Sequence, residues 1–339
     1  MELMYAKQSM ETGKTEVGLL RNYDADFEIG VDENSFIIKT PLRTEKELLY
    51  IEGRISTVVY VEGTEYGGKI TGSTLDIGGG TVKYTGKTWR GMLEQFIIEP
   101  PKGEDYRIVS AGANLKDVID SLPHPPEIVY QPCGYTLPRQ FQFDRYIKTS
   151  EGVTKLMADV DSTLHLRISY DLEPQAAFGK CTTYIEPRRD LRDKINFSQD
   201  YSNNIDLKIT HDGSTPKRLI CLGKGDLKDR EVLNLYADAN WNVTKQEIAG
   251  AYPVETYDYS STENLEADGM KHYQEIINAH EKIEVNINNM DIKLDDLVGA
   301  RDNITGESVE AEITGIVWKR TDYGDYATET WEYKTKARY

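Results

Sequence analysis

A strand–turn–strand pattern at residues 69–98 most constrains the fold of this chain, because its beginning recurs near the C-terminus. The first copy opens with Lys69-Ile70-Thr71-Gly72 and reaches Trp89 after 20 positions. The second copy opens with Glu312-Ile313-Thr314-Gly315 and reaches Trp331 after 19 positions. Two matched units predict two copies of one small β-domain, although a match this short also arises by chance.

Residues 1–85 carry the pattern of a small antiparallel barrel or sandwich. Short runs of strand-forming residues alternate with turn residues such as Asp32-Glu33-Asn34, and helical periodicity is almost absent. Phe36-Ile37-Ile38 is continuously apolar, which predicts a strand covered on both faces. The expected strands are residues 2–6, 26–30, 35–39, 53–61, 66–75 and 81–84.

Residues 86–187 predict an α+β module. Apolar residues recur at helical spacing in three segments, and Pro100 and Pro123 follow the first two of them. In the first helix we expect Trp89, Leu93 and Phe96 to be buried, because they share one helical face. The expected helices are residues 89–98, 114–122 and 152–161, and the expected strands are residues 164–168 and 181–185.

Residues 196–236 return to a β pattern, and an insertion and closing strands follow. Asp212-Gly213-Ser214 lies between two apolar runs and predicts a hairpin. The clearest helix of the chain, at residues 262–280, has Glu263 and Glu266 in its first turn, where the helix dipole favours acidic residues. The expected strands are residues 205–210, 218–222, 231–237 and 282–287.

These patterns predict a mainly β fold with α+β insertions, built on two similar small antiparallel β-barrels. At 339 residues the chain is long enough for about two domains with sizeable cores. We expect a first barrel at residues 1–88, an α+β module at 89–190, a second barrel formed by 191–238 and 282–339, and a helical insertion at 239–281 associated with the α+β module.

The chain is acidic, with a net charge of −17 and a sequence pI near 4.8. Stable DNA binding requires Lys and Arg to neutralise phosphates, so this balance argues against nucleic-acid binding. An acidic surface suits a passage that nucleic acid must cross without adhering, and simple solubility also explains the charge. The sequence contains neither a signal-peptide pattern nor an apolar stretch long enough to predict a membrane span.

The motifs predict no enzyme, and no catalytic, cofactor-binding or metal-binding residue. Gly78-Gly79-Gly80 lacks the lysine and Ser/Thr of a P-loop and lies between strands, which indicates a hairpin turn. The five histidines lack zinc-site spacing, and residues 291–296 lack the glycine of a calcium loop. Cys133, Cys181 and Cys221 are too widely spaced for a zinc knuckle or a disulfide framework. A carboxylate pair for glycan hydrolysis can still lie among the 57 acidic residues.

Several segments resemble the baseplate-hub proteins of phage tails, in particular the Tal-like tail proteins of siphophages. The turn at residues 68–72 (GKITG), the run at 86–93 (GKTWRGML) and the run at 96–101 (FIIEPP) are similar to the family's strand-to-helix segment after its first barrel. Gln95 and Phe96 stand where the family commonly has an arginine.

A later segment, residues 293–298 (KLDDLV), resembles the family's L-G-D-x-V strand of the last barrel. Asp295 replaces the glycine of that pattern. The resemblance covers essentially the whole chain, although its motifs are degenerate.

This resemblance implies a structural hub of two similar barrels with two α/β insertions, assembled as a trimer. Three copies of two barrels give six similar units, which match the sixfold tail-tube ring. The implied partners are further copies of this chain and the distal-tail or tail-tube ring protein. The implied location is the tip of a phage, prophage or tailocin tail, after synthesis in the host cytoplasm. Since the sequence ends at Tyr339, just after the last expected strand, we expect no lysin domain.

Two other classes of function remain open from the sequence alone. One is a glycan hydrolase that acts on the cell wall. The other is a carbohydrate-binding β-domain protein, because the 22 tyrosines and four tryptophans can supply stacking platforms for sugars.

Overall fold

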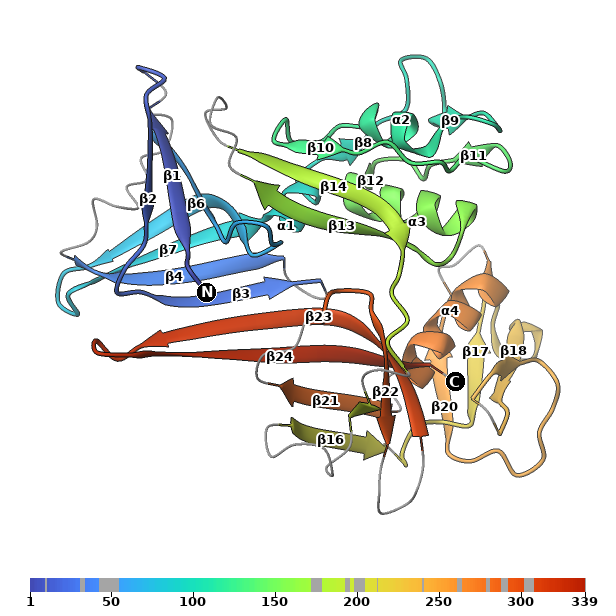
Figure 1. The fold of residues 1–339 in the computed structure, drawn as a ribbon. Coiled ribbons are helices and arrows are strands. Elements are labelled where there is room, and N and C mark those ends of the chain that lie inside the picture. Colours follow the sequence, from blue (N-terminus) through green and yellow to red (C-terminus); the bar gives the residue numbers. More distant parts are fainter. Residues whose placement is uncertain are drawn as a thin grey trace. The chain divides into compact units, whose positions relative to one another are not determined.

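The computed structural model of the protein describes most of the chain. The described residues are 1–9, 11–30, 34–42, 55–171, 179–192, 196–197, 205–211, 213–239, 241–260, 264–278, 281–287, 292–301 and 308–338. The chain divides into two compact units (Figure 1). Residues 1–190, 286–296 and 313–334 form the first unit, and residues 191–285, 297–312 and 335–339 form the second.

The described residues of the first unit begin with seven strands that form one antiparallel sheet. Its strands are β1 Met4–Ser9, β2 Thr15–Leu19, β3 Asp24–Ile29, β4 Ser35–Pro41, β5 Ile55–Tyr60, β6 Gly67–Asp76 and β7 Thr81–Thr88. Their order is β3-β4-β7-β6-β5-β1-β2, and each neighbouring pair is antiparallel. Six of these strands were predicted from the sequence, and β2 was not. In β2, Gly18 and two charged or polar residues interrupt the apolar pattern.

A long C-terminal hairpin extends this sheet. Strand β23, Ser308–Asp322, pairs with β3 through residues 316–320, and β24, Ala327–Arg338, lies next to β23. The two Ile-Thr-Gly segments found in the sequence therefore each lie on the first strand of a hairpin, β6 or β23. The two tryptophans differ, because Trp89 begins a helix whereas Trp331 lies within β24. Superposition of two complete barrels stays a prediction.

The sheet curls around a core of its own. Phe27 stacks on Phe36 with 4.9 Å between ring centroids, and on Trp318 of β23 at 5.3 Å. The predicted mainly β fold is confirmed, and the structure shows its antiparallel sheets to be curled. The buried side chains of this cluster come from β1, the β2–β3 connection and β3 to β7, with one from β23: Leu3, Tyr5, Leu20, Tyr23, Ala25, Phe27, Phe36, Ile38, Val59, Val61, Ile70, Val82, Tyr84 and Trp318.

Strand β5 is covered on both faces. Val59 packs into the core of the curled sheet, whereas its neighbours Val58 and Tyr60 pack into the core of the α+β module. The apolar run Phe36-Ile37-Ile38 predicted a strand covered on both faces, which is wrong because Ile37 is 36% exposed. An apolar run identifies a strand, but only tertiary packing decides whether both of its faces are covered.

The α+β module follows in the same unit. Its helices are α1 Trp89–Leu93, α2 Leu115–Asp120 and α3 Thr149–Val160. Its strands are β8 Ile97–Ile98, β9 Ile108–Val109, β10 Ile128–Tyr130, β11 Phe141–Gln142, β12 Ile147–Lys148, β13 Leu164–Asp171 and β14 Lys180–Pro187. The main sheet has the order β10-β14-β13, in which β10 is parallel to β14 and β13 is antiparallel to it.

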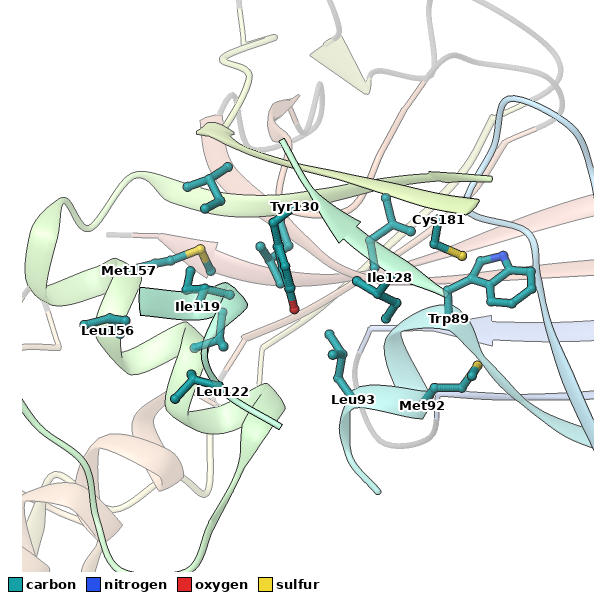
Figure 2. Packing of buried hydrophobic residues seen from close by; sticks show 14 of the residues in the cluster. Trp89, Met92, Leu93, Ile119, Leu122, Ile128, Tyr130, Leu156, Met157 and Cys181 are labelled. Carbon is teal, nitrogen blue, oxygen red and sulfur yellow. The ribbon is translucent and has the colours of Figure 1, made fainter. Parts of the chain in front are cut away.

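Figure 2 shows how side chains of α1, α2 and α3 pack into one core. Trp89, Met92 and Leu93 of α1 point toward the same cluster as Ile128 of β10 and Cys181 of β14. Trp89 is fully buried, and its ring lies parallel to Tyr170 with 4.6 Å between the centroids. The helices predicted at 114–122 and 152–161 are confirmed as α2 and α3.

The helix predicted at residues 89–98 is wrong in its second half. Helix α1 ends at Leu93, and β8 pairs with β12 through Ile98 and Ile147. The carbonyl oxygen of Phe96 accepts a hydrogen bond from the backbone nitrogen of Thr149, which fixes the chain in an extended course. Phe96 is therefore half-buried, while Trp89 and Leu93 are buried as predicted.

The second unit contains a separate four-stranded sheet with a helix. Its strands are β17 Arg218–Leu222, β18 Val232–Ala237, β19 Val243–Thr244 and β20 Val254–Asp258, in the order β19-β18-β17-β20. Helix α4, Leu265–Asn278, packs on it through Leu265, Tyr273 and Ile277 and confirms the helix predicted there. The sequence predicted residues 218–237 in a second barrel and residues 243–258 in the insertion. In the structure, the strands of these two segments pair with each other.

The hairpin predicted around Asp212-Gly213-Ser214 is wrong. Strand β16, Ile205–His211, neighbours β21, Glu281–Ile287, whereas β17 pairs with β18 and β20. Asp212 itself lies outside the described residues. Strands β16 and β17 belong to different sheets. Turn chemistry does not determine the partner of each strand. The other strands of this unit are β15, Asn196–Phe197, and β22, Leu297–Arg301, which pairs with the start of β23. The remaining domain boundaries stay predictions.

Candidate functional site

The strand register of the first unit brings two β-turns to one end of the curled sheet. At that end Asp76 pairs with Thr81, and Thr81 pairs with Pro41. On the other side of β4, the backbone nitrogen of Asp322 donates a hydrogen bond to Asp24 Oδ1 at 2.9 Å. The β6–β7 turn and the β23–β24 turn therefore lie along the same end of the sheet (Figure 1). We call this end, formed by Asp24, residues 75–80 and residues 322–326, the rim.

The β23–β24 turn presents two tyrosine rings to solvent. Tyr323 and Tyr326 are 57% and 63% exposed, and their rings stack with 5.0 Å between centroids. The backbone nitrogen of Tyr323 donates to the carbonyl oxygen of Tyr326 at 2.9 Å, and Gly324 has a φ of 86°, which favours glycine. The turn thus holds the two rings against each other before any partner arrives.

The β6–β7 turn presents aliphatic side chains at the same end. Ile77 is 74% exposed and Leu75 is 55% exposed. Asp76 Oδ1 accepts a hydrogen bond from the backbone nitrogen of Gly79 at 2.8 Å, and Gly80 closes the turn with a φ of 65°. The Gly78-Gly79-Gly80 triplet is therefore a hairpin turn, as the sequence indicated. Clustered exposed apolar side chains of this kind mark interaction sites.

A polar cluster of the first unit joins α1 to the connection between β5 and β6 and to β13. Arg90 donates from Nε and Nη2 to the two carboxylate oxygens of Glu65 at 2.8 and 3.2 Å, and from Nη2 to the carbonyl of Leu166. Burial alone would lower the pKa of Arg90, but the Glu65 carboxylate outweighs it and raises that pKa. This pair is largely buried and holds α1 in place.

Two neighbouring carboxylates, Asp295 and Asp296, tie the segment before β22 to this module. Asp295 Oδ2 lies 3.1 Å from His165 Nδ1, and Asp296 binds Arg189 through both oxygens at 2.8 and 2.5 Å. Burial would raise the pKa of Asp295, but the hydrogen bond with His165 and the charge of Arg90 lower it below its usual value. The KLDDLV segment that resembled a family motif thus has a structural role in this chain.

A cavity of about 360 Å³ lies in the first unit near this cluster. Tyr66, Trp331 and Tyr333 line it together with aliphatic side chains and the basic residues His165, Arg167 and Lys293. Glu65 is the carboxylate among the described lining residues. Glu65 is engaged by Arg90, and glycoside hydrolysis needs two carboxylates across the scissile bond. This cavity thus offers one carboxylate among its described lining residues, and that carboxylate is already paired.

The described residues contain no group of three or more His, Cys, Asp or Glu side chains that could hold a metal ion. Within the same residues no helix is both long enough and apolar enough to cross a membrane. Cys181 and Cys221 are buried, and burial raises the pKa of both thiols. No site residues were predicted from the sequence. The rim was not predicted because the exposure of its side chains depends on strand register.

Neither a protein-family model nor a curated protein sequence matches this chain. Its fold does match solved structures over nearly the whole length. A tail protein from Neisseria meningitidis MC58 is 15% identical with a TM-score of 0.53, over 99% of this chain and 97% of that one. The 43 kDa tail protein of prophage MuSo2 from Shewanella oneidensis is 12% identical with a TM-score of 0.55, over 100% and 98%.

A third match is the prophage tail protein gp18 from Listeria monocytogenes EGD-e, which is 10% identical with a TM-score of 0.51, over 100% of this chain and 95% of that one. The chain therefore has the fold of phage and prophage tail proteins. The tail-protein fold that the resemblance in the sequence implied is thus confirmed.

Proposed function

We propose that this chain is a structural hub protein at the distal end of a phage, prophage or tailocin tail. It docks on the tail-tube ring as a trimer and forms part of the baseplate channel. The observation that carries this proposal is the match of the fold to three tail proteins over almost their entire lengths. The curled sheet with its exposed rim supports it, because a structural protein of this kind works through surfaces and not through a catalytic pocket.

The acidic charge supports a role beside a passing genome. Three copies carry a formal charge of −51 around one axis, from −17 for each chain. Phosphates find few partners on acidic or neutral walls, so nucleic acid passes without being held. We expect a lumen poor in Lys and Arg and no affinity for duplex DNA.

The same charge controls assembly. Repulsion between acidic protomers opposes trimerisation at low ionic strength and weakens as salt screens it, because the Debye length falls from about 30 Å at 0.01 M to about 10 Å at 0.1 M. The free protein is therefore monomeric or weakly associated at low salt, and the trimer forms on the tail ring.

Sedimentation velocity across a salt series, with and without a purified tail-ring protein, tests the proposal. We expect association to increase with salt, and a stable complex to form when the ring protein is present. A salt-independent dimer, or tight binding of duplex DNA at 0.15 M salt, would contradict the proposal.

A further inference from the structure

The rim combines aromatic, aliphatic and acidic groups in a way that defines the chemistry of a partner. Tyr323, Tyr326 and Ile77 are among the most exposed large apolar side chains of the first unit. Tyrosine is enriched at the energetic centres of protein interfaces, because it buries a large rigid ring at a low cost in conformational entropy. Two tyrosines that are already stacked have lost that freedom before binding.

Aspartates outnumber the basic residues around these rings. Asp24, Asp76, Asp322 and Asp325 lie at the rim. The basic residues nearby are Arg21 of the β2–β3 connection and Arg320, whose guanidinium packs over the Tyr23 ring and donates to the Tyr23 carbonyl. A carboxylate beside an aromatic face favours Lys and Arg, which gain both an ion pair and a cation–π contact. A second copy of this chain is a poor occupant, because it would bring the same acidic turns together.

We propose that the rim is the surface through which this protein docks on a basic protein partner. That partner presents Lys or Arg side chains around an apolar recess that receives Tyr323, Tyr326 and Ile77. This inference rests on the proposed function and identifies the partner with the ring protein on which the hub docks. The stacked tyrosines supply most of the binding energy, and the aspartates set the rate and salt dependence of association.

The decisive experiment measures binding of the purified ring protein to the full chain by calorimetry at 0.15 M salt. The test variant is the double substitution Tyr323→Ala and Tyr326→Ala. The matched controls are Tyr323→Phe with Tyr326→Phe, which keeps both rings, and Tyr252→Ala, which removes a tyrosine that is 76% exposed in the second unit. Circular dichroism and the thermal midpoint confirm that each variant folds.

We expect the double alanine variant to bind at least about tenfold more weakly, as the loss of interface anchors does. Both controls should bind like the wild type. Asp325→Lys should slow association and flatten its salt dependence, because rim charges act mainly on the association rate.

Each other outcome contradicts a specific statement. Equal binding by the wild type and the double alanine variant would overturn the rim as the docking surface and leave the hub function intact. An alanine variant that fails only in association with copies of itself would show that the rim joins protomers. Absence of binding by the wild type itself would overturn both the inference and the proposed docking.

Discussion

Replacing Trp89 by alanine should strongly destabilise the first unit. The side chain is fully buried and lies in one cluster with Tyr60, Met92 and Leu93, and its ring is parallel to Tyr170. A buried tryptophan covers up to about 250 Å², and at about 25 cal/mol per Å² this gives an upper bound of about 6 kcal/mol. A compact unfolded chain already hides part of this area, so we expect a loss of about 3–5 kcal/mol.

Replacing Trp89 by phenylalanine is the matched control. The indole Nε1 is buried without a hydrogen-bond partner among the described residues, and burying such a donor costs about 1–3 kcal/mol. Phenylalanine removes that donor and keeps a ring against Tyr170, although it leaves a smaller cavity. The two effects oppose each other, so we expect a net loss of only about 1 kcal/mol.

Guanidinium denaturation followed by far-UV circular dichroism measures both variants. Tryptophan fluorescence is unsuitable because the substitution removes one of four tryptophans. A chain with two units need not unfold in one step, so the comparison uses the transition that the substitution shifts. The reasoning is refuted if Trp89→Ala costs less than about 1 kcal/mol, or if phenylalanine costs as much as alanine.

Two further predictions concern titratable groups of the described cores. The folded pKa of Asp295 is lowered, so its contribution to stability is complete above the unfolded value of about 3.9 and is lost as the pH falls through the lower folded value. Asp295→Asn should therefore destabilise the protein at pH 7. The midpoint of unfolding of this variant should decrease less steeply as the pH is lowered than that of the wild type. An unchanged dependence of the midpoint on pH would contradict this. Burial raises the pKa of Cys181 well above its usual value and that of Cys221 to about 11, so a thiol reagent at pH 8 should label only the half-buried Cys133 in the folded protein. Two or more rapidly labelled thiols per chain would show that these cores open readily.

The sequence predicted the elements whose signal is local. Helices α2, α3 and α4 follow from helical spacing of apolar residues, and most strands of the first sheet follow from β-branched runs between turn residues. Helix α1 ends before the predicted residue because the following residues pair as β8 with β12. The paired residues are about fifty positions apart in the sequence. No local pattern carries that information.

The candidate surfaces were less predictable for the same reason. The Tyr323-Gly324-Asp325 turn was evident from its residues. That it lies at the same end of the sheet as the β6–β7 turn follows from the pairings between β3, β4, β7 and β23. The contact of His165 with Asp295 joins residues 130 positions apart. Sequence spacing identifies turns, and the strand register decides which turns share an end of the sheet.

We propose that this chain is a trimeric hub seated on a sixfold tail ring. The mass of its complex with the ring protein, determined by native mass spectrometry and checked by electron microscopy of the same sample, tests this proposal. We predict three copies of this chain on one sixfold ring, with a central opening. A stable complex with one copy of this chain per ring subunit, or no complex under conditions in which both proteins are folded, would contradict the claim.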